Sequence, residues 1–262
     1  MRLLRRAALD GVQLDEIDNR ILIQKIEPAS GKDQFNAVSL WDQPGNRVNK
    51  KHRDYVDVTV TFSMDIKKNA YTERSEIFEK VMSWAMGGGM LTLSQKPDRQ
   101  IRVIAAQLPA EGDPLEWTNR YSITFRAYGV PYWQQETPDQ LRILDVSSTS
   151  RQFGVTGNVR SVMDVSFTNT SGGTINSFSI TCGGSTISLS GIGLGNGETL
   201  TIDHPDTGEK SWLRIRIGSR SVLNCRSAGS SNDLYVTPGT ITISMTAGGS
   251  GTLLVSCNGR YA

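Results

Sequence analysis

The sequence predicts a mainly β protein of two domains: a β-barrel or sandwich with one helix and a projecting hairpin, followed by a β-sandwich. Strict alternation of apolar and polar residues indicates strands, and only one stretch has helical periodicity. Composition also changes along the chain, because residues 1–142 hold 20 Lys/Arg and 8 Gly, whereas residues 143–262 hold 8 Lys/Arg, 18 Gly and 35 Ser/Thr. We therefore expect domains at 1–142 and 143–262, with a linker near residues 138–150.

The clearest strand covers residues 56–66, where every second residue is apolar. A second alternating segment, residues 119–127, is followed by Pro131, which cannot continue a regular ladder and holds Tyr132 and Trp133 at the strand terminus. Further strands are expected at residues 20–26, 90–94 and 101–108. Together these segments predict a small antiparallel sheet or barrel.

The single predicted helix covers residues 72–86. Thr72 suits its N-cap, and three consecutive glycines, Gly87 to Gly89, supply the left-handed conformations that end a helix. Its apolar stripe consists of Ile77, Phe78, Val81, Met82, Trp84 and Ala85. Because the glycines follow the helix and do not precede it, they do not indicate a phosphate-binding loop.

A long polar excursion, residues 29–55, separates the first two strands. Pro44 and Gly45 suit a type II turn, so the segment reads as a hairpin with Val38, Leu40 and Trp41 before its tip. We expect such an arm, without a core beneath it, to pack on another subunit; a surface loop is the alternative. The basic cluster at residues 50–53 is expected to be a solvated loop.

The second domain is predicted to contain only short strands, separated by glycine-rich or polar turns. They are expected at residues 163–168, 174–181, 185–189, 198–203, 212–217, 234–236, 241–246 and 252–257. Breaks such as Gly183-Gly184 and Gly248-Gly249 at these intervals favour a β-sandwich of jelly-roll type.

Few residues offer chemistry for catalysis. The chain has two histidines, His52 and His204, and a net charge of +2, which does not suggest the concentrated basic face of a nucleic-acid binder. His204 lies between Asp203 and Asp206, so a metal site or a base is one interpretation, but Pro205 favours a turn. No G-x-S-x-G elbow is present. We therefore expect no enzyme, no cofactor and no metal.

The three cysteines, Cys182, Cys225 and Cys257, are an odd number at wide spacing, which favours buried thiols in a reducing cytoplasm. No run of about 20 apolar residues predicts a membrane span. Arg5 and Arg6 interrupt the N-terminal apolar run before a secretory signal could develop. We expect the chain to stay in the compartment where it is made.

Two aromatic residues of the second domain, Trp212 and Tyr235, could stack on a sugar ring, and core packing is the alternative role for each. A carbohydrate-binding module that recognises a host surface is therefore one functional interpretation. A hydrolase attached to a β-sandwich and acting through His204 is another.

The order and spacing of the elements are more informative than any single motif. The segments concerned are residues 56–66, 84–89, 91–93, 96–99, 121–125, 131–133, 198–203 and 236–241. Their order and spacing resemble those of the distal tail proteins (Dit) of long non-contractile-tailed phages over nearly the whole chain. Thr240 stands where that family commonly has asparagine.

The resemblance implies a first domain with the tail-tube fold, six copies of which close into a ring, and a belt hairpin at about residues 29–55 that clasps the neighbouring subunit. The implied inter-subunit residues are Val38, Leu40, Trp41, Pro44, Gly45 and Arg47. The second domain is implied to be galectin-like and to face outward.

The function implied is that of a structural hub in the virion tail tip, assembled in the host cytoplasm. Its implied partners are the tail tube protein, a tail tip or tail-associated protein, and receptor-binding or baseplate proteins. DNA would pass through the lumen of the hexamer without specific binding, and no membrane insertion is expected.

Overall fold

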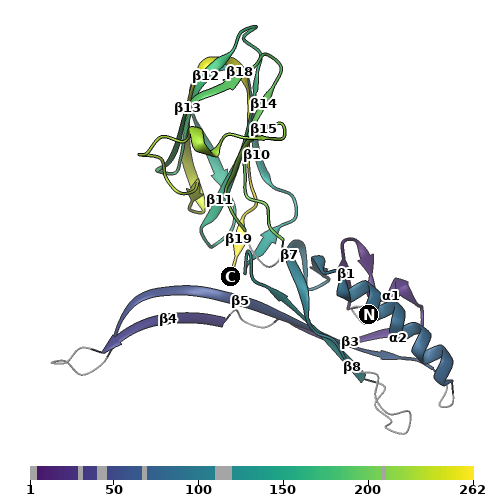
Figure 1. Cartoon of the computed structure of the whole chain (residues 1–262). Coiled ribbons are helices and arrows are strands. Elements are labelled where there is room, and N and C mark those ends of the chain that lie inside the picture. The colour runs from purple at the N-terminus through teal and green to yellow at the C-terminus, as the bar shows by residue number, and fades with distance from the viewer. Residues whose placement is uncertain (1–4, 29–31, 40–45, 67–69, 110–119, 208–210) are drawn as a thin grey trace. The chain divides into compact units, whose positions relative to one another are not determined.

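The computed structural model describes residues 5–28, 32–39, 46–66, 70–109, 120–207 and 211–262 (Figure 1). The fold is mainly β, as predicted, and divides into two compact units: Met1–Trp133 with Asp206–Lys210, and Gln134–Pro205 with Ser211–Ala262. The division falls earlier than the expected boundary at 142/143. The reason is that the expected linker, residues 138–150, lies mostly in β10 (Asp139–Val155), a strand of the second unit.

The first unit contains one long helix and a curled antiparallel sheet in the order β2-β1-β6-β7-β8-β5-β3, with β4 paired to β5. Its elements are β1 (Ala7–Leu9), β2 (Val12–Gln13), α1 (Leu14–Ile17), β3 (Ile21–Pro28), β4 (Lys32–Ser39), β5 (Asn46–Met64), α2 (Tyr71–Met86), β6 (Gly89–Leu93), β7 (Lys96–Gln107) and β8 (Arg120–Ala127), and β9 (Trp133–Gln135) crosses the boundary between the two units. The expected strands are all present, whereas β1, β2 and α1 were not predicted. These three segments are too short to show a hydrophobic period.

The core of the first unit lies between α2 and the sheet. Alternate residues of β5 are buried, as the pattern predicted, and one face of α2 covers them. The Phe78 ring lies 5.5 Å from Tyr121, which in turn stacks on Phe62 at 5.6 Å. Packing of these rings fixes the helix on the sheet.

The ends of α2 agree only in part with the prediction. Thr72 is not the N-cap, because the helix already begins at Tyr71, and its N-cap residue Ala70 makes no side-chain capping bond. Gly88 and Gly89 adopt φ values of 61° and 140°, as a helix exit requires. A Cβ on Gly88 would lie 2.6 Å from the Val103 carbonyl oxygen, so glycine is also required by close packing on β7.

The predicted hairpin is present. β4 pairs antiparallel with the first part of β5, from Lys32 opposite Tyr55 to Ser39 opposite Asn46. The basic residues 50–53 lie within this ladder, so the expectation that they form a loop is wrong. Figure 1 shows the hairpin extending from the body of the first unit.

The second unit is a nine-stranded antiparallel sheet in the order β13-β12-β18-β11-β14-β15-β16, with β10 beside β18 and β17 beside β11. Its elements are β10, β11 (Ser161–Asn169), β12 (Ile175–Cys182), β13 (Ser185–Leu194), β14 (Thr199–Asp203), β15 (Arg214–Ile217), β16 (Arg220–Ser221), the 3-10 turn η1 (Leu223–Cys225), β17 (Tyr235–Val236) and β18 (Gly239–Cys257), and the short β19 (Arg260–Tyr261) lies outside the nine-stranded sheet. The sheet folds over one apolar core, in which Phe167 of β11 and Phe178 of β12 lie 5.1 Å apart. This arrangement agrees with the predicted sandwich.

One strand of the sandwich differs from expectation. Residues 241–246 and 252–257 were predicted as separate strands with a break at Gly248-Gly249, but both belong to β18. The first half of β18 pairs with β12 and the second half with β11, while β10 follows β18 along its length. The register with β10 shifts beside these glycines, and they let the strand pass close to Ile175, because a Cβ on Gly249 would lie 2.9 Å from Ile175 Cγ1.

Candidate functional site

The hairpin offers a free strand edge. Within the part of the chain that the structure describes, β4 pairs only with β5, so the hydrogen-bonding groups on the other side of its backbone have no neighbouring strand. An edge of this kind is a ready template for pairing with another chain. The hairpin is therefore a candidate assembly surface.

The predicted contact residues divide into two groups. Val38 and Arg47 lie opposite each other in the β4–β5 ladder, near the tip. Leu40, Trp41, Pro44 and Gly45 lie outside the described residues. Their assignment to an inter-subunit contact stays a prediction.

The hairpin is fixed where it leaves the sheet by four residues, Tyr55, Asp57, Arg126 and Tyr128, which we call the root cluster. Arg126 of β8 donates from Nε and Nη2 to the two carboxylate oxygens of Asp57, at 2.5 and 2.7 Å. Its guanidinium lies 3.9 Å from the centre of the Tyr55 ring and also donates to the Tyr128 hydroxyl at 3.1 Å. The Asp57 carboxylate raises the pKa of Arg126, so this cation stays charged.

The two aromatic residues that follow β8, Tyr132 and Trp133, each lie beside a cation. Trp133 is buried, with Lys96 Nζ 4.8 Å from its ring centre. The Cζ atom of the Arg53 guanidinium lies 5.0 Å from the centre of the Tyr132 ring. Burial lowers the pKa of Lys96. Because Arg53 lies in β5, the contact with Tyr132 adds a second support for the hairpin base.

The two aromatic candidates of the second unit are not core residues, so the core-packing alternative is wrong for both. Trp212 is 41% exposed, and Tyr235 is half-buried. The Arg160 guanidinium lies 4.2 Å from the centre of the Tyr235 ring. Trp212 is thus the more exposed of the two rings, whereas a cation already occupies one face of Tyr235.

His204 is buried in the turn after β14, and it bridges two distant carboxylates. Its Nδ1 lies 2.8 Å from Asp164, on β11, and its Nε2 contacts Asp233, before β17. Burial alone would lower the pKa of His204, but the two carboxylates outweigh it and raise the pKa to about 9. A protonated imidazole that donates from both nitrogens can neither accept a proton nor bind a metal at neutral pH.

The hydrolase interpretation relied on His204, and the structure pairs both nitrogens of this imidazole with carboxylates. Among the residues that the structure describes, no group of three or more His, Cys, Asp or Glu side chains has a metal-binding arrangement. Cys182 and Cys257 are buried, and burial raises the pKa of each thiol to about 12, while Cys225 is only half-buried. No helix in the described ranges has the length and apolar character needed to cross a membrane.

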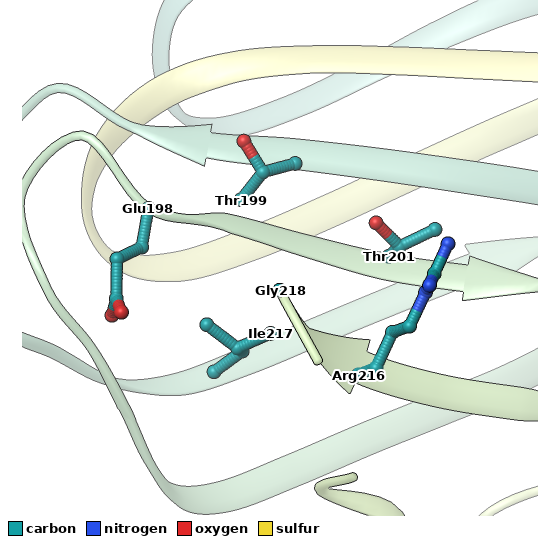
Figure 2. Close-up of a pocket in the computed structure, with 6 residues that line it drawn as sticks. All are labelled: Glu198, Thr199, Thr201, Arg216, Ile217 and Gly218. Atoms are coloured by element: carbon teal, nitrogen blue, oxygen red, sulfur yellow. The ribbon is translucent and has the colours of Figure 1, made fainter. Parts of the chain in front are cut away.

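The second unit has a hollow on the outer face of β14 and β15, which the sequence did not reveal. Its volume is about 350 Å³. It is lined by Glu198, Thr199, Thr201, Arg216, Ile217 and Gly218 (Figure 2). Both strands alternate, so their apolar residues enter the core and their polar residues reach this surface.

The fold is shared with proteins of the phage adsorption apparatus. The SPP1 Dit protein (gp 19.1), described as a paradigm of the hub adsorption apparatus in phages that infect Gram-positive bacteria, matches with a TM-score of 0.67 at 12% identity, over 96% of this chain and 98% of that one. A chain of the phage p2 baseplate in its activated conformation with Sr matches with a TM-score of 0.51 at 7% identity, over 97% of both chains. No family model and no curated protein matches the sequence. The Dit-like, mainly β fold that the resemblance implied is thus confirmed.

Proposed function

We propose that this protein is a distal tail protein: a structural hub that forms a hexameric ring, joins the tail tube to the tip or baseplate, and lets DNA pass. The fold shared with a phage hub protein over nearly the whole of both chains supports this proposal. So does the near-neutral net charge of +2, because a lumen that passes DNA should not hold it strongly. The role is structural, and its location is the virion tail.

The observation that carries the proposal is the β4–β5 hairpin. An isolated two-stranded hairpin is marginally stable in water, and this one leaves the edge of β4 without a neighbouring strand among the described residues. A neighbouring copy would pair with that edge. Repetition of one such heterologous contact generates a ring when the rotation between successive copies closes.

The test is removal of the arm while its root is kept. Residues 33–53 are replaced by an Asn-Gly turn, which leaves Tyr55 and the root cluster in place. We expect the wild-type chain to give a hexamer by native mass spectrometry, and the shortened chain to give a folded monomer. A shortened chain that still forms hexamers, or a wild-type chain that stays monomeric at high concentration with tail tube and tip proteins added, would contradict the proposal.

Glycan recognition by the second unit is a second candidate, favoured by the exposure of Trp212. It is compatible with a hub that also contacts the host surface. Glycan binding by the full chain that is lost on Trp212→Ala would support it, and retention of binding in that variant would exclude Trp212 as the contact.

A further inference from the structure

The hollow on β14 and β15 combines residues from a regular register. Thr201 of β14 lies directly opposite Arg216 of β15, and the buried Leu200 lies opposite Ile217. Figure 2 shows the Arg216 side chain rising beside Thr201, with Glu198 at the other end of the hollow. The wall is therefore held by the strand ladder.

Arg216 has donor capacity that no described residue uses. Its Nε is buried and has no hydrogen-bond partner among the residues that the structure describes. The Asp203 carboxylate is already held by Arg214 at 2.8 and 2.6 Å, and Arg216 Nη2 lies 3.7 Å from Asp203 Oδ2, beyond hydrogen-bond distance. A buried N–H without an acceptor costs free energy, which a ligand oxygen would recover.

The opposite end of the hollow supplies an acceptor. Glu198 accepts the Gly195 amide through Oε2 at 2.6 Å, which orients the carboxylate. Between Glu198 and Arg216 lie the hydroxyls of Thr199 and Thr201, and Thr199 also shares a hydrogen bond of 2.8 Å with Thr168 on β11. The hollow thus combines a group that only donates, a group that only accepts, and hydroxyls that do both.

This combination selects the ligand class. A simple anion would be repelled by the Glu198 carboxylate, and a simple cation would be repelled by the Arg216 guanidinium. A neutral ligand with adjacent hydroxyls satisfies all these groups together, because each hydroxyl both donates and accepts. The volume of about 350 Å³ falls in the range of small-molecule sites. We propose that the hollow between Glu198 and Arg216 is a binding subsite for a neutral saccharide.

This subsite is distinct from a contact at Trp212, and it does not rest on the proposed ring. The full chain is screened against an array of neutral and anionic glycans, and the best neutral hit is titrated by isothermal calorimetry and by NMR. We expect Arg216→Gln and Glu198→Gln each to weaken binding about tenfold or more. The matched control, Arg151→Gln on the exposed surface of β10, should bind as the wild type does.

NMR on the wild-type chain keeps the test independent of the folding of any variant. Saccharide addition should shift the amide signals of Thr199, Thr201 and Gly218. The proposal is overturned if no neutral glycan binds at millimolar concentration, if only anionic glycans bind, or if those three amides do not move. It is also overturned if binding survives Arg216→Gln but is lost on Trp212→Ala.

Discussion

Asp57 and Arg126 lie directly opposite each other on β5 and β8, and two parallel hydrogen bonds join them where β5 leaves the sheet to form the hairpin. Both side chains are about one-quarter exposed. A bidentate pair in this setting fixes direction as well as position, because the planar guanidinium and carboxylate must stay coplanar. The pair therefore links the first-unit sheet to the proposed assembly arm.

Loss of this pair should affect assembly more than folding. We expect Arg126→Gln to lower the free energy of unfolding by about 1–2 kcal/mol, since it removes a charge-assisted pair but no core contact. The proportion of hexamer should fall, because the arm loses its fixed direction. Denaturant unfolding and native mass spectrometry measure the two effects. Arg120→Gln, on the same strand and exposed, is the matched control.

Trp84 connects α2 to the sheet and to the N-terminal segment. Its indole Nε1 donates to the Val12 carbonyl at 3.0 Å, and its ring meets Phe125 edge-on, with centroids 5.8 Å apart. We expect Trp84→Ala to lower the stability of the first unit by about 3 kcal/mol, near the low end of large-to-small changes because the ring is only half-buried.

Trp84→Phe separates the two contributions. It keeps much of the ring contact and loses the hydrogen bond, so a loss of about 1 kcal/mol is expected. Thermal unfolding followed by calorimetry provides the measurement. A Trp84→Ala melting curve that coincides with that of the wild type would show that neither contact matters.

The elements that the sequence predicted correctly are those with one buried and one exposed face. β5 and β8 alternate because one face is buried, and α2 shows a stripe for the same reason. β10 has no such signal, since it is an edge strand that is exposed on most of its length, and its residues therefore read as a linker. β18 was divided at Gly248-Gly249, because a glycine pair has the same appearance at a turn and at a bend within a strand.

The candidate sites depended on register, which the sequence did not reveal. Asp57 and Arg126 are 69 residues apart, and only the pairing of β5 with β8 brings them together. The sequence neighbour of His204, Asp203, pairs with Arg214, whereas His204 binds Asp164 and Asp233 from distant segments. Composition gave no signal for these partners.

The stability of the second unit should fall in alkaline solution through His204. The folded-state pKa of about 9 lies above the ordinary value of 6.5, so the stabilisation is fully present below about pH 6.5 and is lost as the pH rises through 9. Its size is on the order of 3 kcal/mol. His204→Gln should lower stability at pH 6 and flatten its pH dependence between 6.5 and 9. Denaturant titrations of both proteins across this range provide the measurement. If the stabilities of the wild type and of His204→Gln change equally with pH between 6.5 and 9, the pH dependence does not come from His204.

A substitution at Gly251 tests whether β18 is one continuous strand. It lies opposite Val146 on β10 and Asn169 on β11, and a Cβ there would come within 2.4 Å of both Phe167 Cζ and the Thr168 carbonyl oxygen. Phe167 is fully buried, so neither neighbour can move away without disturbing the core.

We expect Gly251→Ala to destabilise the second unit by about 2–3 kcal/mol, as overpacking does. Gly154→Ala on β10 is the matched control, because a Cβ there meets nothing within 4 Å and the backbone has no left-handed conformation. That change should be neutral or slightly stabilising, since alanine restricts the unfolded chain. Differential scanning calorimetry compares the two variants. If both melt alike, residue 251 lies at a turn between two strands, and the single strand from Gly239 to Cys257 is wrong.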